Sequence, residues 1–159
     1  MTSVRLAVQS DLDQLAIVWH DAWQDGHAGL LPAELTRHRT LPSFRERLNG
    51  YFAELRVVGP VGAPLGFYTL QGDELYQLFV SAEARGTGVA AALIADAEAR
   101  LTERGVTTAW LSCAIGNQRA ARFYEKCEWH LVGVVVENAA TPEGPVALEV
   151  WRYEKQLGR

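Results

Sequence analysis

The fold of this chain is decided by the stretch Val80-Ser81-Ala82-Glu83-Ala84-Arg85-Gly86-Thr87-Gly88-Val89-Ala90. An apolar run typical of a β-strand ends here, and a short loop with two glycines leads directly into a strong helix pattern. The first backbone N–H groups of a helix have no partner inside it, and the helix dipole makes that end positive. The stretch therefore predicts a site for a phosphate or pyrophosphate group.

The segments on either side of this loop predict a strand–helix–strand unit. The apolar run over residues 74–80 is followed by an alanine-rich helix pattern over 88–104, which stops near Gly105, and by a compact apolar strand over 107–113. A connection of this length is typical of parallel strands. We therefore expect the strands at 74–80 and 107–113 to be parallel.

The rest of the chain adds further strands and helices to this unit. Turn clusters separate the segments between residues 54 and 80, so these segments predict an antiparallel meander. The further strands are expected at 4–8, 54–58, 64–71, 130–137 and 146–153, and the further helices at 11–26, 33–48 (weaker, interrupted by Pro42) and 117–127. The expected fold class is α/β: one domain over residues 1–159, with a mixed, mostly antiparallel sheet of about seven strands and helices on both faces.

Composition excludes several classes of protein. The 159 residues carry a formal net charge of −4 with no basic stripe, which argues against a nucleic-acid partner. No apolar run approaches the roughly 18 residues of a membrane span, and the first residues lack the pattern of a signal peptide. Cys113 and Cys127 fit no metal or disulfide spacing. A cytoplasmic protein without membrane contact is expected.

The glycine loop has two other readings. Gly86-x-Gly88-x-x-Ala91 partly matches the dinucleotide-binding fingerprint, which would indicate a nicotinamide-dependent oxidoreductase. However, the loop follows the fourth predicted strand rather than the first, and the next strand ends in Leu111-Ser112-Cys113, without the acid that holds the ribose. The second alternative is an ordinary strand-to-helix turn that binds no ligand.

Two motifs at a characteristic separation resemble a known family. Arg85-x-x-Gly88-x-Ala90 resembles the Q/R-x-x-G-x-G/A signature of the GNAT superfamily of acyl-CoA-dependent N-acetyltransferases. The stretch from Asn117 to Cys127 is similar to its N-x-x-A-x-x-F-Y-E-K helix, and the first helix with the loop 29–32 is similar to its substrate-side region. The resemblance spans nearly the whole chain. The chain departs from it at Glu128-Trp129, where many members have Gly-Phe, so the preceding helix is expected to end differently.

The resemblance implies acetyl-CoA as cosubstrate and a set of residues that hold it. The backbone from Arg85 to Ala90 would hold the pyrophosphate, and the freed edge of the preceding strand would pair with the pantetheine arm, with a backbone N–H, most simply that of Phe79, as oxyanion donor. One face of the second-motif helix would line the cofactor channel. The implied cofactor-binding residues are Leu78, Phe79, Val80, Arg85, Gly86, Thr87, Gly88, Val89, Ala90, Asn117, Ala120, Phe123 and Tyr124.

Two residues are candidates for catalysis. Tyr124 would protonate the departing thiolate, since its ordinary pKa of about 10 keeps it protonated at neutral pH; the alternative is a structural tyrosine. Glu74 would be the general base. It lies six positions before Val80, which puts both on one face of a regular strand. Its alternative is an exposed acid next to Asp73.

Weaker candidates face the acceptor. Trp19, Trp23 and His27 on the first helix would contact substrate, the alternatives being packing or surface positions. No H-x-x-x-H pair and no Cys/His cluster is present, so no metal is expected. Specificity should come from the first helix, residues 26–50 and the link at 137–146, where irregular loops vary.

The sequence thus predicts an N-acetyltransferase. It would transfer an acetyl group from acetyl-CoA to a primary amine of a small molecule or peptide by direct attack in a ternary complex. Alternatives are a longer acyl donor, and a non-catalytic acyl-CoA-binding or sensor domain of the same fold. A homodimer formed by strand exchange or pairing near the C-terminus is a further hypothesis.

Overall fold

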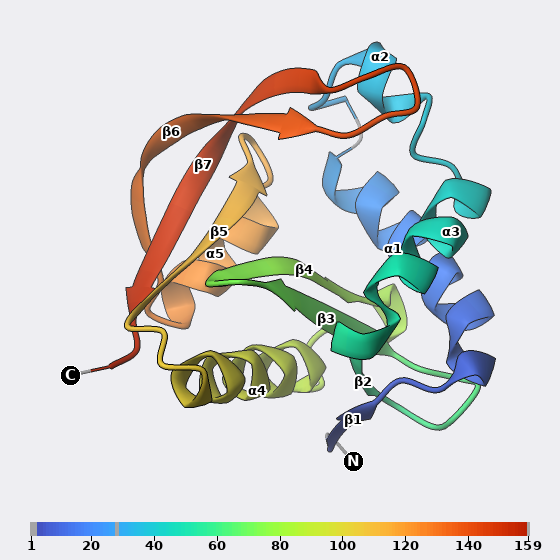
Figure 1. The fold of residues 1–159 in the computed structure, drawn as a ribbon, viewed down its shortest axis with the longest axis vertical. Helices are drawn as coiled ribbons and strands as arrows, with labels where there is room; N and C mark the ends of the chain where they lie inside the picture. Colours follow the sequence, from blue (N-terminus) through green and yellow to red (C-terminus); the bar gives the residue numbers. More distant parts are fainter. Residues whose placement is uncertain (1–2, 28, 159) are drawn as a thin grey trace.

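Seven strands pair into a mixed sheet in the order β1-β2-β3-β4-β5-β7-β6 (Figure 1). The computed structural model describes residues 3–27 and 29–158. The strands are β1 (Val4–Leu6), β2 (Arg56–Val58), β3 (Gly66–Gln71), β4 (Glu74–Val80), β5 (Thr108–Ala114), β6 (His130–Ala139) and β7 (Val146–Gln156). The helices are α1 (Leu12–His27), α2 (Ala33–Thr36), α3 (Leu41–Tyr51), α4 (Val89–Glu103) and α5 (Gln118–Lys126). The expected fold class and the meander over β2–β4 are confirmed.

Side-chain alternation divides the core between the two faces of the sheet. On one face Tyr68 and Leu75 pack with α4, whose buried residues include Leu93. On the other face Phe67 packs with α1 and α3, and Trp19 on α1 is fully buried there. Figure 1 shows α4 on one side of the sheet and the pair α1 and α3 on the other. Since both faces of β3 are covered, that strand reads as a nearly continuous apolar run.

In the described part of the chain, the parallel strands β4 and β5 pair only where β4 begins. Glu74 pairs with Trp110, and the Trp110 N–H donates to the Asp73 carbonyl at 3.3 Å. Beyond this point the described residues of β4 and β5 form no ladder, so the two strands diverge and the sheet opens between them. The expectation of parallel strands is confirmed, and the divergence is what creates room for a ligand.

The segment 33–48 was expected as one weak helix, but the structure divides it into α2 and α3. Thr40 caps the second helix, since its side chain accepts a hydrogen bond from the Ser43 N–H, and Pro42 lies in the first turn. Proline is tolerated in that turn because the N–H it lacks would have no partner there. Pro42 therefore starts a helix here rather than interrupting one. None of the helices in the described part of the chain is long and apolar enough to cross a bilayer.

The expected relation between Glu74 and Val80 is wrong. A β-bulge shifts the register of β4 against β3: Leu75 pairs with Leu70, whereas Gln77 pairs with Thr69. The extra residue reverses the side-chain alternation. Leu75 and Val80 both pack on the α4 side although they are five positions apart. Glu74 therefore lies on the opposite face of β4, the face of Phe79 and α1.

Candidate functional site

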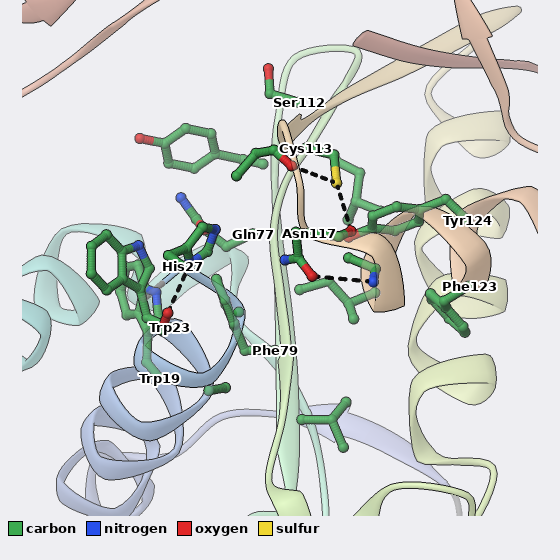
Figure 2. Close-up of a pocket in the computed structure, with 18 of the residues that line it drawn as sticks. Trp19, Trp23, His27, Gln77, Phe79, Ser112, Cys113, Asn117, Phe123 and Tyr124 are labelled. Carbon is green, nitrogen blue, oxygen red and sulfur yellow. Dashed lines mark hydrogen bonds between the residues drawn. The ribbon is translucent and has the colours of Figure 1, made fainter. Parts of the chain in front are cut away.

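A cleft of about 980 Å³ fills the opening between β4 and β5. Its walls come from both halves of the chain. Figure 2 shows Trp19, Trp23 and His27 of α1 on one side of the cleft and Phe123 and Tyr124 of α5 on the other. The glycine loop before α4 borders one end, and the link after β6 borders the other.

Free backbone donors lie at the glycine-loop end. Gly88 is the N-cap of α4 and has φ 90°, a left-handed conformation that other residues adopt with strain. Among the described residues, no backbone carbonyl accepts a hydrogen bond from the N–H groups of Gly86, Gly88, Val89, Ala90 or Ala91. The helix dipole adds positive potential to these donors. This end of the cleft can bind a phosphate without any cationic side chain.

Three side chains of the loop are not free to contact an anion in the cleft. The side chain of Val89 is buried in the core, and Thr87 donates its hydroxyl to the Ala84 carbonyl, so neither side chain borders the cleft. Arg85 does border the cleft, but its guanidinium donates to Asp25 on α1 at 2.8 Å. An anion could therefore use the loop's backbone directly, whereas Arg85 would have to share its charge with Asp25.

The middle of the cleft follows the free edge of β4. Leu78, Phe79 and Val80 border it, as do Asn117 and Ala120. The Asn117 Oδ1 accepts the Ala120 N–H at 3.3 Å and so caps α5, which leaves its amide nitrogen available. Because β5 has diverged, an extended ligand with amide groups can pair with the backbone edge of β4, as a strand would.

Tyr124 lies in the wall of the cleft with its hydroxyl unpaired among the described residues. Its ring packs against Phe123 and Tyr153 at centroid distances of 5.5 and 6.1 Å. Burial raises the pKa of the Tyr124 phenol above its usual range, and the neighbouring Cys113 and Cys127 raise it further. The hydroxyl is therefore protonated at neutral pH and can donate a proton or a hydrogen bond into the cleft.

Glu74 borders the cleft near the point where β4 and β5 meet. It is only 7% exposed. Burial raises its pKa to about 7, with the charges of Glu137 and Asp73 adding to the shift and Arg152 opposing it. A carboxyl with a pKa near neutrality is suited to take a proton from an ammonium group and release it again.

The first-helix candidates also lie at the cleft. Trp19 and Trp23 are buried and also border the cleft. The sequence left open whether they pack in the core or line the site, and in the structure they do both. His27 Nδ1 lies 2.9 Å from the Trp23 carbonyl, and burial lowers the pKa of this imidazole (Figure 2). Cys113 borders the cleft too, but burial raises the pKa of its thiol to about 12, with a contribution from Glu125. A protonated thiol is a poor nucleophile.

The sequence did not identify several residues at the far end of the cleft. Arg39, Arg47, Trp110 and Glu137 all border it. Arg39, Arg47 and Glu137 fall in the segments 26–50 and 137–146 that were expected to govern specificity, but no local pattern distinguished them from surface residues. Only the packing of these segments over the sheet brings them together.

Within the described residues, no three His, Cys, Asp or Glu side chains gather as metal ligands would.

A mixed sheet that opens between two parallel strands, beside a glycine loop at a helix N-terminus, defines the N-acetyltransferase class of fold. The model of the acetyltransferase (GNAT) family matches residues 15–129, and the chain belongs to that family. It is therefore an acyltransferase, as the sequence predicted. No curated protein sequence matches it closely enough to count as a relative.

Solved structures similar to this chain share its fold over nearly their whole length. A GCN5-related N-acetyltransferase from Rhodopseudomonas palustris is 19% identical, with a TM-score of 0.75, and the match covers 99% of this chain and 96% of that one. A phosphinothricin acetyltransferase from Sinorhizobium meliloti in complex with AcCoA is 18% identical (TM-score 0.71; 99% and 90% covered). The PaiA N-acetyltransferase from Thermoplasma acidophilum in complex with coenzyme A is 18% identical (TM-score 0.66; 97% and 98% covered).

Proposed function

We propose that this enzyme transfers the acetyl group of acetyl-CoA directly to a primary amine in a ternary complex. One observation carries the proposal. A single cleft joins free backbone donors before α4 to a buried carboxyl, Glu74, and a protonated phenol, Tyr124. The cleft thus combines a phosphate site, a base and an acid in one volume.

The residues present fit coenzyme A. The N–H groups of Gly86 and Gly88 to Ala91 suit its pyrophosphate, since they have no other backbone partner among the described residues. The free edge of β4 at 78–80 suits the amides of the pantetheine arm, and the Asn117 amide nitrogen provides a further donor. The Phe79 N–H is the proposed donor to the thioester carbonyl oxygen, where negative charge develops.

The reaction needs three proton transfers, and two side chains of the cleft have candidate roles in them. Glu74 takes a proton from the incoming ammonium, and the resulting amine nitrogen attacks the thioester carbon. The new N–C bond replaces the C–S bond, and Tyr124 gives its proton to the departing thiolate. The tyrosinate then takes the remaining extra proton of the acylated nitrogen, and Glu74 releases its proton to solvent. Cys113 does not form an acyl-enzyme in this scheme, because its thiol stays protonated.

The test is release of free thiol from acetyl-CoA in the presence of a panel of amines, for the wild type and Tyr124→Phe. We expect turnover by the wild type with at least one amine. The variant should lose about 10²-fold in kcat while its Kd for acetyl-CoA stays the same, since the phenol acts as acid and not as a binding group.

Other results would select a rival. Binding of CoA without turnover of any amine would support an acyl-CoA sensor of the same fold. Thermal stabilisation by NAD but not by CoA would support a nicotinamide-dependent protein, because a ligand stabilises only the fold that binds it.

A further inference from the structure

Two arginines border the far end of the cleft, away from the glycine loop, and neither has a carboxylate partner among the described residues. We call this end the acceptor end, because the proposed amine would bind there. Arg39 lies between α2 and α3, and Arg47 lies on α3. Arg39 is only 8% exposed, and its guanidinium donates to the Ala140 carbonyl at 3.0 Å. The Arg47 guanidinium lies over the Trp19 ring, 4.6 Å from its centroid. Neither arginine has a carboxylate within 4.0 Å in the described part of the chain, whereas Arg85 at the other end of the cleft pairs with Asp25.

Two guanidinium groups and an indole N–H supply unused donors at this end of the cleft. Burial lowers the pKa of Arg39, and the charge of Arg47 lowers it further; Tyr76, Tyr51 and Glu137 oppose this more weakly. A buried guanidinium whose counter-charge lies beyond ion-pair distance is unfavourable, so an anion bound against it would be stabilised. The Trp19 indole N–H, beneath Arg47, also lacks an acceptor among the described residues.

The arginines lie near the proposed base. The charge of Glu137 acts on both Glu74 and Arg39, so Glu137 is close to both parts of the site. One part is acidic and suits an ammonium group, and the other is basic and suits a carboxylate. A planar carboxylate matches the paired donors of a guanidinium better than a point charge would.

Two segments of the chain meet beside the acceptor end. Glu143 in the β6–β7 link pairs with Arg37 and lies 3.1 Å from His38 Nε2. Together with the bond from Arg39 to Ala140, these contacts hold the link against the turn before α3. Figure 1 shows the end of the β6–β7 hairpin next to α2. Because these two segments are held together beside the arginines, we take this end of the cleft to suit a small acceptor better than a protein chain.

We propose that the acceptor is a small amine that also carries a carboxylate. Arg39 and Arg47 hold the carboxylate, and the amine faces Glu74. This inference rests on the proposed acetyl transfer and names the substrate class of the same site.

The experiment compares matched amines that differ only in the carboxylate, such as L-leucine with 3-methylbutylamine and L-phenylalanine with 2-phenylethylamine. Thiol release from acetyl-CoA gives kcat/KM for each amine. We expect the wild type to prefer the carboxylate-bearing member by about 10²-fold, since two charge-assisted hydrogen bonds are at stake. Arg39→Gln and Arg47→Gln should each reduce that preference about tenfold or more. Arg122→Gln on the exposed face of α5 is the control and should keep both the rate and the preference.

Each other outcome has a definite meaning. The carboxylate site would be overturned if the wild type preferred the amines that lack the carboxylate. It would also be overturned if properly folded arginine variants lost kcat/KM equally for both amines of a pair. Turnover of 1-aminoalkylphosphonates without turnover of amino acids would replace the carboxylate with another anion. If no amine of either kind reacts while CoA binds, the proposed acetyl transfer fails first and this inference falls with it. Melting temperature and the Kd for acetyl-CoA separate a local effect from misfolding.

Discussion

Glu74 and Tyr124 have environments that suit opposite directions of proton transfer. Glu74 is buried and Tyr124 is partly buried, and burial raises both pKa values: that of Glu74 to about 7, and that of Tyr124 above its usual range. Tyr124 became a catalytic candidate from its place in the second motif, and Glu74 became one from its distance in sequence to the glycine loop. The protonated state of Tyr124 at neutral pH was predicted, but the raised pKa of Glu74 was not, because it depends on burial and on Glu137, which lies 63 positions from Glu74 in the sequence.

The pH dependence of kcat/KM tests the role of Glu74. The base is active as the carboxylate, so the rate should rise with pH up to about 7 and then level off. Glu74→Gln should lower kcat about 10²-fold or more and abolish that acidic limb. Steady-state kinetics between pH 5.5 and 9 measure both effects.

Asp73→Asn is the matched variant for this prediction. The negative charge of Asp73 raises the pKa of Glu74, so its removal should move the acidic limb to lower pH without abolishing it. If Glu74→Gln retained the wild-type limb, another group would be the base.

At the scale of elements, the end of α5 shows how tertiary packing overrides a local preference. The sequence predicted a different helix end because glutamate occupies position 128. Instead Glu128 adopts a left-handed φ of 70°, and the Trp129 N–H donates to the Tyr124 carbonyl at 3.0 Å. This is the usual glycine-type helix end. Trp129 is buried, at 1% exposed, and its packing keeps the turn in place.

Replacing Glu128 should therefore stabilise the protein. Glu128→Gly relieves the left-handed strain and is expected to raise the free energy of unfolding by about 0.5–1 kcal/mol. Glu128→Ala removes the same carboxylate but keeps the strain, so it should give no comparable gain. Urea denaturation of the two variants measures the difference, and equal stabilities would mean that backbone strain is not the cause.

Elements with strong local patterns could be predicted, and those shaped by contacts could not. Strand β4 has its expected bounds, and α4 differs by one residue at each end, because alanine content and glycines define these elements. Helices α2 and α3 were expected as one because Pro42 was interpreted as an interruption, whereas Thr40 and Pro42 begin α3. The bulge in β4 has no sequence pattern of its own, so the face of Glu74 was assigned wrongly.

At the scale of the whole molecule, the site depends on segments far apart in the chain. The glycine loop and α5 carry contiguous motifs, so their place together at one site could be predicted from the sequence. The acceptor end combines α1, α3, the start of β4 and the link after β6, so Arg39 and Arg47 became visible only in the fold.

The N-terminal edge of the sheet is also held by contacts between segments far apart in the chain. Asp11 accepts hydrogen bonds from Arg5, the Val8 N–H and the Gly62 N–H, at 2.8 to 2.9 Å.

Asp11 should give the protein an acid-sensitive part of its stability. Burial alone would raise the pKa of Asp11, but the hydrogen bonds from Arg5, Val8 and Gly62 outweigh it and lower the pKa to about 2 from 3.8. A carboxyl whose pKa is lower in the folded than in the unfolded state stabilises the fold at pH values above its unfolded-state pKa. That stabilisation is lost as the pH falls through the folded-state pKa. The shift corresponds to about 2 kcal/mol at neutral pH, lost between about pH 4 and pH 2.

Asp11→Asn tests this contribution. The variant should lose at least about 2 kcal/mol at pH 7 and show a flatter dependence of stability on pH below 5. Asp13→Asn is the control, because Asp13 pairs with Arg45 while its side chain is 91% exposed, and exposed pairs contribute little. Equal losses in the two variants would contradict the role given to Asp11.

The proposed function requires acetyl-CoA to lie in the cleft between β4 and β5. A crystal structure of the complex with acetyl-CoA tests this placement most directly. We expect the pyrophosphate within hydrogen-bond distance of the N–H groups of residues 86–91, the pantetheine arm along 78–80, and the thioester between Glu74 and Tyr124. A pyrophosphate bound away from the start of α4, or a thioester far from both side chains, would contradict it.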